Sequence, residues 1–394
     1  MIKLKGITWN HTRGFLPLVG IAQRLEERNP EICIQWEKRS LQAFADAPIE
    51  DLAKQYDLLI IDHPHAGMSA ASGALLPLEQ ILPKEFLADQ AAHQVGRSHD
   101  TYNYDGHQWA LAIDAATPVA FWRPDSLKKL GVSPPQTWDE LLEFARTGKV
   151  VVPAIPIDSL MNFYSLCVDQ NDSLFRSKDQ LVEPETGRTA LLRLKQLIDL
   201  CPSSCLERNP IRIHEALLSE SDPAVYCPFA YGYSNYSRPG YAPVPLRYGN
   251  VVSGPSGQPF RTTLGGTGLA ISAHCQHTEA AAEFARMVAG PEAQAGLFFD
   301  YGGQPGHRSA WLDPRTNSAA GDFFSNTLET LDRAYIRPRY HGYMHFQDEG
   351  SLVVHAYLSG KADADTTLQA LAGLYRESLA TDPLVETLSN DRCS

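Results

Sequence analysis

Two histidines, His63 and His65, stand two residues apart after a short apolar run, with Asp62 beside them. Imidazole rings next to a carboxylate bind metal ions, transfer protons or hydrogen-bond a polar ligand. This spacing fits no closed zinc signature. We therefore expect no metal and no cofactor, and we predict that His63 and His65 contact a ligand directly.

Residues 9–14 (WNHTRG) form a second candidate corner of the site. They lie between an expected strand and an expected helix, and the exposed amides of a helix start suit an anion or a hydroxyl group. We predict that Trp9 and His11 contact the ligand. The alternative is that Trp9 belongs to the core and that Arg13 is a solvated surface charge.

Aromatic residues give a third signal, because tyrosines crowd a stretch rich in Gly and Pro, at positions 226, 231, 233, 236 and 241. Aromatic faces stack on sugar rings or planar ligands, and phenol groups supply hydrogen bonds. We favour Tyr231 and Tyr233 as ligand contacts, together with Trp122 and Tyr164. The alternative is that half of these tyrosines only pack the loop.

The elements that must position these residues alternate between strand and helix over the first hundred residues. Apolar patterning predicts strands over residues 2–9, 32–36 and 58–61, with helices near 18–25 and 49–54 between them. The third run (LLII) fits a central strand buried on both faces. This β-α-β-α-β order predicts right-handed crossovers and an open parallel sheet.

A second α/β region is expected after Asp114. Thr137 and Glu140 form a capping box that opens a helix ending near Arg146, before a strand over residues 150–152. Further helices are expected, and they cover residues 159–168, 188–200, 278–288 and most of 322–389.

Several sequence blocks stand in a characteristic order: residues 105–114 (DGHQWALAID), 118–125 (PVAFWRPD), 130–131 (LG), 135–141 (PQTWDEL), 265–272 (GGTGLAIS) and the run 283–305. In this order they resemble the extracellular solute-binding proteins of family 1, which are the substrate-capturing subunits of carbohydrate-type ABC importers. The likeness covers most of residues 4–312. It implies an α/β, two-lobed type II periplasmic-binding-protein fold, in which each lobe is a mostly parallel sheet flanked by helices and the ligand cleft lies at the hinge.

The resemblance also implies how the chain divides. Residues 109–122 would cross from the first lobe to the second, and residues 264–272 would cross back, which makes a hinge. We expect residues 1–112 with 266–312 to form the first lobe. Residues 113–265 with 313–394 would form the second lobe and the carboxy-terminal helices.

Three more site residues follow from the resemblance, and a fourth, Arg308, follows from its place after a helix-to-strand return. Asp114 would be a polar contact at the crossover, and Gly265 and Gly266 would act through close backbone approach. Arg308 would favour a carboxylate or phosphate. The alternative is that Arg308 ties the carboxy-terminal helices to the lobe.

The composition narrows the class of function. Lys and Arg number 34 against 46 Asp and Glu, so the net charge is -12, without runs of like charge. Nucleic acid and membrane are therefore not expected as partners. No nucleophile elbow, Walker loop or dinucleotide fingerprint occurs.

We expect a solute-binding protein that captures a small polar solute, sugar-like or hydroxylated or carboxylated, by closing its lobes, with an ABC permease as a further partner. The alternative is a cytosolic enzyme or ligand sensor that uses the same fold and the histidine-rich loop.

The amino terminus shows no secretory leader, and no stretch approaches the roughly 18 apolar residues of a membrane span. The chain as written is therefore expected in the cytoplasm, or in the periplasm if Met1 replaces a trimmed leader. Seven cysteines are scattered along the chain, and we expect reduced thiols, with Cys201 and Cys205 as separate thiols.

Overall fold

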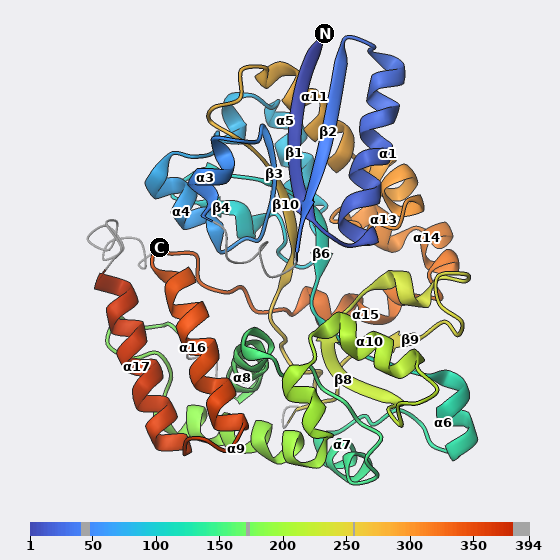
Figure 1. Ribbon diagram of the computed structural model, residues 1–394, viewed down its shortest axis with the longest axis vertical. Coiled ribbons are helices and arrows are strands. Elements are labelled where there is room, and N and C mark those ends of the chain that lie inside the picture. Colours follow the sequence, from blue (N-terminus) through green and yellow to red (C-terminus); the bar gives the residue numbers. More distant parts are fainter. Residues whose placement is uncertain (41–47, 171–173, 255–256, 381–394) are drawn as a thin grey trace.

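A five-stranded sheet organises the first lobe of the computed structural model, which describes residues 1–40, 48–170, 174–254 and 257–380 (Figure 1). Its strands lie in the order β2 (Ile32–Arg39), β1 (Ile2–Trp9), β3 (Leu58–Ile61), β10 (Gly265–Ile271) and β6 (Leu111–Ala116). β1 pairs in parallel with β2 and β3, as predicted. β10 is antiparallel to both of its neighbours, because it carries the chain back from the second lobe.

Helices cover both faces of this sheet (Figure 1). α1 (Thr12–Arg28) and α11 (Thr278–Ala289) pack with β1 and β3 into one apolar core, and α3 (Ile49–Ala53) and α4 (His65–Ser72) pack into a second core. All four side chains of β3 are buried, as expected of a central strand. Shorter elements of this part of the chain are η1 (Leu78–Gln80), α5 (Lys84–Ala92), η2 (Asp100–Tyr102), β4 (Asn103–Tyr104), β5 (His107–Gln108), α12 (Pro291–Ala293) and the π-helical η5 (Gln294–Phe298).

The second lobe contains a three-stranded sheet in the order β8 (Tyr226–Tyr231), β7 (Pro118–Trp122) and β9 (Arg247–Gly249). Both pairings are antiparallel. The prediction of a mostly parallel sheet is therefore wrong for these strands, because β7 leaves the hinge while β8 returns to it. The expected strand at residues 150–152 forms only a parallel bridge from Val150 to Tyr226.

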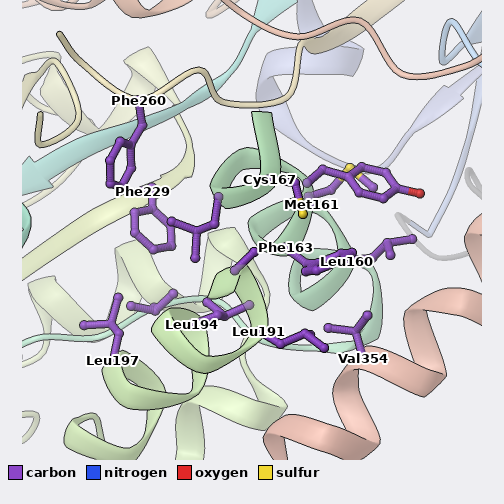
Figure 2. Close-up of a cluster of buried hydrophobic side chains, with 14 of the residues drawn as sticks. Leu160, Met161, Phe163, Cys167, Leu191, Leu194, Leu197, Phe229, Phe260 and Val354 are labelled. Atoms are coloured by element: carbon purple, nitrogen blue, oxygen red, sulfur yellow. The ribbon is translucent and has the colours of Figure 1, made fainter. Parts of the chain in front are cut away.

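Helices α8 (Pro156–Gln170), α9 (Pro184–Leu200) and α16 (Tyr343–Leu358) enclose the largest apolar core of the second lobe (Figure 2). α17 (Ala364–Ala380) packs outside α16 and α9. The predicted capping box is confirmed at the start of α7 (Trp138–Ala145). The other elements of this lobe and its margin are α6 (Pro124–Leu130), η3 (Ser203–Glu207), α10 (Pro210–Leu218), η4 (Ser234–Ser237), α13 (Arg308–Leu312), α14 (Pro314–Ala319) and α15 (Phe323–Asp332). No helix in the described ranges has both the length and the apolar character needed to cross a bilayer.

Hydroxyl groups fasten the two strand crossovers to each other at the hinge. Thr117, between β6 and β7, bonds with the Thr262 hydroxyl at 2.7 Å and donates to the Thr263 carbonyl at 3.0 Å. A third segment joins them, because the backbone of Leu264 donates to the Tyr335 carbonyl at 2.7 Å. The lobes are therefore connected by three extended segments that hydrogen-bond to one another, rather than by one loose linker.

Gly266, just inside β10, has a backbone that only glycine adopts easily. Its φ is +103°, and an added Cβ would lie 2.2 Å from the Asp114 carbonyl oxygen. Gly240 also has a positive φ, +82°, but an added Cβ there would meet nothing within 4 Å. An alanine at Gly266 would therefore meet both backbone strain and a steric clash, whereas an alanine at Gly240 would meet backbone strain alone.

We predict that Gly266→Ala lowers the free energy of unfolding by about 2–4 kcal/mol, because φ strain and a backbone clash each cost about 1–3 kcal/mol. Gly240→Ala, the matched control, loses only about 1 kcal/mol, since it adds strain without a clash. Urea denaturation of both variants checks this. Equal losses would show that the close approach at Asp114 does not constrain the hinge.

Candidate functional site

The loop after β3 connects the two lobes through an ion pair. Asp62 directly follows the strand and accepts hydrogen bonds from Arg337 at 2.8 and 2.6 Å. Arg337 lies on the segment that leads into α16, and its side chain is buried. Burial by itself would raise the pKa of Asp62, but Arg337 and His63 outweigh this and hold the pKa well below its usual range. The Asp62 carboxylate is therefore charged, and both of its oxygens are paired with Arg337.

The two predicted histidines flank this pair and are both buried. Burial lowers the pKa of each imidazole to about 4, helped at His63 by the Arg337 charge. His63 Nδ1 lies 3.2 Å from the Asp62 carboxylate, whereas its Nε2 and Nδ1 of His65 have no hydrogen-bond partner within the described ranges. The site thus holds two neutral imidazoles, each with one nitrogen that can bind a polar group.

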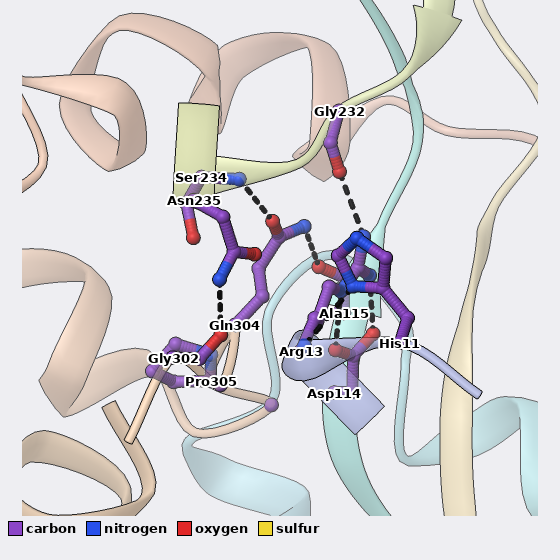
Figure 3. Close-up of polar contacts among 12 residues, drawn as sticks. His11, Arg13, Asp114, Ala115, Gly232, Ser234, Asn235, Gly302, Gln304 and Pro305 are labelled. Carbon is purple, nitrogen blue, oxygen red and sulfur yellow. Dashed lines mark hydrogen bonds and ion pairs between the residues drawn. The ribbon is translucent and has the colours of Figure 1, made fainter. Parts of the chain in front are cut away.

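A second buried ion pair forms at the start of α1 (Figure 3). Arg13 donates to both oxygens of Asp114, at 2.7 and 2.5 Å, and to the Gly232 carbonyl at 2.8 Å. The two side chains are 5% and 1% exposed. Burial raises the pKa of Asp114, and the short bonds from Arg13 oppose that shift. Arg13 therefore joins the first lobe, the hinge strand β6 and the second lobe.

This geometry corrects two interpretations of the sequence. Arg13 is not a solvated surface charge, and the sequence analysis missed its role; the signal was its place in the first turn of a helix that follows a strand end. Asp114 is where the hinge was predicted, but both of its oxygens accept from Arg13. It therefore acts on the site through Arg13.

A neutral bridge lies beside the ion pair (Figure 3). The Gln304 side chain donates to the Ala115 carbonyl and accepts from the Ser234 backbone, both at 2.9 Å. Asn235 donates to the Gly302 carbonyl at 2.9 Å. The hinge strand and the second lobe are thus held by amide groups as well as by charge.

The structure separates the two residues predicted at the end of β1. His11 caps α1 by accepting from the Arg13 backbone at 3.0 Å, and its ring meets Tyr233 at 4.9 Å. Burial, aided by the Arg13 charge, lowers the pKa of His11 to about 4. Trp9 is 5% exposed in the first core and covers Gly14, where an added Cβ would lie 2.4 Å from the ring. Trp9 therefore packs in the core, which was the alternative for it, and its contact with a ligand stays a prediction.

Tyr231 packs against the hinge glycine Gly265, and ligand contact by either residue stays a prediction. The Tyr231 hydroxyl bonds with Thr263 at 3.0 Å, and its ring occupies the space beside Gly265, where an added Cβ would lie 2.5 Å away. Tyr233 lies deeper, with the Arg13 guanidinium 4.7 Å above its ring. Tyr231 thus faces the junction of the lobes, whereas Tyr233 supports the ion pair.

Asp158, in the first turn of α8, is a candidate that the sequence analysis missed. It is buried, its Oδ2 has no hydrogen-bond partner within the described ranges, and burial alone raises its pKa to about 8. It interacts electrostatically with Tyr231 and Tyr233. The signal was available, because Asp158 begins a helix after the expected strand 150–152, as residues 9–14 do after β1.

Tyr164 lies farther along α8, fully buried in the second core. Its phenol interacts with that of Tyr343, the first residue of α16, and burial raises the pKa of both groups. Tyr343 in turn interacts with Arg337, Asp62 and Tyr231. Tyr164 therefore interacts with the junction through Tyr343. The sequence did not predict Tyr343 as a site residue.

Two predicted site residues lie elsewhere. Trp122 ends β7 and pairs with Tyr226, at the opposite end of the strand from Pro118, which pairs with Tyr231. Arg308 donates to Asp332 at 2.8 and 2.5 Å, so its charge is already matched. Arg308 thus has the tie to the carboxy-terminal helices that was its alternative, and ligand contact by Trp122 or Arg308 stays a prediction.

A hollow of about 440 Å³ opens at the margin between the lobes. Arg97 lines it from the first lobe, and Arg261 and residues 332–336 line it from the hinge and the second lobe. Residue 336 adjoins Arg337, which contacts Asp62.

One family model matches the chain, over residues 8–170, and it describes bacterial extracellular solute-binding proteins. The match confirms the resemblance read from the motifs and runs from the end of β1 to the end of α8. The alternative of an enzyme or sensor is not favoured by it.

Solved structures with the same fold cover nearly the whole chain. Maltose-bound MalE3 of T. maritima gives a TM-score of 0.80 at 18% identity, covering 96% of this chain and 100% of that chain. The GacH receptor of Streptomyces glaucescens GLA.O gives 0.79 at 16%, covering 96% and 99%. A solute-binding protein of Agrobacterium radiobacter K84 in complex with ribitol gives 0.78 at 19%, covering 95% and 98%. These scores confirm the two-lobed periplasmic-binding-protein fold.

We predict that Asp114→Ala lowers the free energy of unfolding by about 3–5 kcal/mol, because it leaves the buried Arg13 guanidinium without a counter-ion. Glu27→Gln, which removes the exposed partner of Arg24, is the control and costs under about 1 kcal/mol. Urea denaturation at pH 7 measures both. If Asp114→Ala is as stable as the wild type, the pair does not anchor the lobes.

The buried histidines predict an acid-sensitive fold. The pKa of His65 is about 4 in the folded chain against about 6.5 when unfolded, so the unfolded chain binds more protons between these values. The contribution of each buried histidine to the free energy of unfolding is complete above pH 6.5. It decreases as the pH falls toward 4, by up to ~1.4 kcal/mol per pH unit.

We predict that His65→Gln makes the loss of stability between pH 6.5 and 4 less steep, because one titrating group is removed. His277→Gln, at an exposed site, keeps the steep loss, since the buried imidazoles remain. Urea denaturation across this pH range tests the pair of variants. A wild-type stability that does not change from pH 7 to 5 would contradict the burial of neutral imidazoles.

Proposed function

We propose that the chain is a bacterial extracellular solute-binding protein, the family whose model matches residues 8–170, and that it captures one small, uncharged, polyhydroxylated solute between its two lobes. The observation that carries this proposal is a set of buried polar atoms at the junction of the lobes without a partner in the described chain. They are Nε2 of His63, Nδ1 of His65 and Oδ2 of Asp158. Burying such atoms without hydrogen bonds costs free energy, which a solute bearing hydroxyl groups would recover.

The charge balance of the junction favours an uncharged solute. Arg13 is matched by Asp114, and Arg337 by Asp62. A carboxylate or phosphate ligand would need a cation that these pairs do not leave free. This narrows the solute from the sugar-like or carboxylated range expected from the sequence to sugars and polyols.

The hydrogen-bonding chemistry agrees with this class. A neutral imidazole nitrogen either donates or accepts, and a carboxyl group whose pKa is about 8, as at Asp158, carries a proton at neutral pH and does both. A hydroxyl group is also both donor and acceptor, so these groups satisfy several sugar or polyol hydroxyls in turn. The rings of Tyr231 and Tyr343 supply apolar faces for the C–H side of such a solute.

Known relatives support the same class. The structural relatives named above were solved with maltose, acarbose or ribitol, all of which carry many hydroxyl groups. The family description as extracellular supports a place outside the cytoplasmic membrane. There the closed form would deliver the solute to the permease of an ABC importer.

Closure itself has a physical basis in the contacts between the lobes. Arg337 on the approach to α16 reaches Asp62 of the first lobe, and Tyr241 bonds with Thr12 at 3.0 Å. These contacts would hold the lobes together over a bound solute, and breaking them would open the site by rotation at the hinge.

We predict that a panel of mono- and disaccharides and polyols contains at least one compound that raises the melting temperature of the wild type, because a ligand of the folded form stabilises it by mass action. Calorimetry then gives its Kd. A panel of carboxylates and phosphates is expected to have no effect. A shift with the anions alone would contradict the charge argument, and no shift with any compound would count against solute capture.

Asp158 supplies the test of the site. Asp158→Ala is expected to weaken binding about tenfold, or ~1.4 kcal/mol, whereas Asp158→Asn keeps a donor and an acceptor and stays near the wild-type Kd. Asp125→Ala, which removes a partly exposed acid paired with Arg123, is the matched control and leaves the Kd unchanged. Unchanged binding by Asp158→Ala would remove this residue from the site.

A further inference from the structure

Three side chains with metal-ligating atoms meet away from the proposed solute site, where the end of α5 meets the segment before α13. They are Asp89, His93 and His307, and one ligating atom from each lies within 4.8 Å of the others. We propose that these three side chains bind a divalent transition-metal ion of the zinc type. This site does not depend on the proposed solute, because none of its residues belongs to the junction described above.

Helix geometry brings two of the ligands together. Asp89 and His93 are four residues apart at the end of α5, so they share one face of the helix. His93 Nδ1 lies 2.8 Å from the Asp89 carboxylate, and the two side chains are 49% and 39% exposed. They therefore can rotate toward an ion without disturbing the core.

The third ligand is fixed by its surroundings. His307 is 3% exposed, and Gln294 accepts hydrogen bonds from the backbones of Gly306 at 2.7 Å and His307 at 3.3 Å. The Arg308 backbone donates to the His93 carbonyl at 2.7 Å, which ties the two segments directly. The protein thus positions His307 against α5 before any ion binds.

The hydrogen bond on the far side of the His307 ring suits a metal ligand. Nδ1 lies 2.7 Å from the Ser309 hydroxyl, and Nε2 faces the Asp89 carboxylate at 3.3 Å. A ligating histidine holds its other nitrogen in this way, because the outer partner fixes the ring and its tautomer. Nδ1 also accepts from the Ser309 backbone at 3.3 Å. With a metal on Nε2, Nδ1 would carry the proton, give up this backbone bond and donate to the Ser309 hydroxyl.

The donor set selects the class of ion. Two imidazole nitrogens and one carboxylate oxygen match zinc and its neighbours in the first transition row, whereas calcium and magnesium prefer oxygen ligands alone. The His93 and His307 rings, 5.0 Å apart, must turn toward a common centre, and the exposed His93 is the one free to do so. Three protein ligands at a partly exposed site leave further positions for water.

The location gives the ion a structural effect. Asp114, on the hinge strand, forms a backbone bridge with Pro305, and Arg308 pairs with Asp332 of α15. An ion at His307 would therefore fasten α5 to the segment that runs beside the hinge. We expect it to stabilise the first lobe without changing solute affinity.

The test uses the full chain, stripped of metal with a chelator, and Zn²⁺ or Co²⁺ as the probe. We expect one ion per chain by calorimetry, a rise in melting temperature with Zn²⁺, and visible absorption from bound Co²⁺. His93→Ala should weaken binding at least tenfold. Its metal-free melting temperature should equal that of the wild type, because the side chain is exposed, so a loss of binding would not reflect misfolding.

Matched variants decide between this site and others. His277→Ala removes a histidine outside the cluster, and the double variant Cys201→Ser with Cys205→Ser removes two thiols; both should bind Zn²⁺ as the wild type does. Ser309→Ala should weaken binding by a few-fold. No binding to the wild type, equal binding by His93→Ala, or loss of binding in the cysteine variant would overturn the proposal.

Discussion

The buried pair of Arg13 and Asp114 is the interaction on which the arrangement of the two lobes depends. It joins the first helix to the hinge strand, and a third bond reaches the Gly232 carbonyl of the second lobe. Removing these charges from water costs several kcal/mol for each ion, so the pair is tolerated only in a geometry that satisfies nearly all of their hydrogen bonds. That requirement fixes where α1 begins, how β6 runs and where the chain turns after β8.

The same requirement shapes the chemistry of the junction. Arg337 is matched by Asp62 as Arg13 is matched by Asp114, so each of these two buried arginines is neutralised by a carboxylate. The polar atoms at the junction without a partner in the described chain lie on two imidazoles and one carboxyl group. These neutral groups can either donate or accept a hydrogen bond. A site of this kind discriminates by the direction of hydrogen bonds rather than by net charge, which is how a protein distinguishes one hydroxylated solute from another.

The sequence predicts the parts of the fold that local patterns determine. The buried run at β3, the capping box at Thr137 and the crossover at Asp114 are confirmed because each depends on residues close together in the chain. The partners of Arg13 and Arg337 could not be predicted, since they lie 101 and 275 positions away. The positions of Trp9 in the core and of Trp122 at the far end of β7 could not be predicted either, because residue type does not reveal which side or end of a strand faces the junction.

The contacts between the lobes also bear on how tightly a solute binds. Closure is an equilibrium between lobe arrangements, and a ligand shifts it only by its difference in affinity for the two forms. Here three hydrogen bonds already cross the junction without a solute. They join Arg337 to Asp62, Arg13 to Gly232 and Tyr241 to Thr12. Each of these bonds raises the share of chains that are closed before the solute arrives, so less binding energy is spent on closing. In the proposed solute-binding role, the strength of these protein contacts would set solute affinity together with the groups that touch the solute.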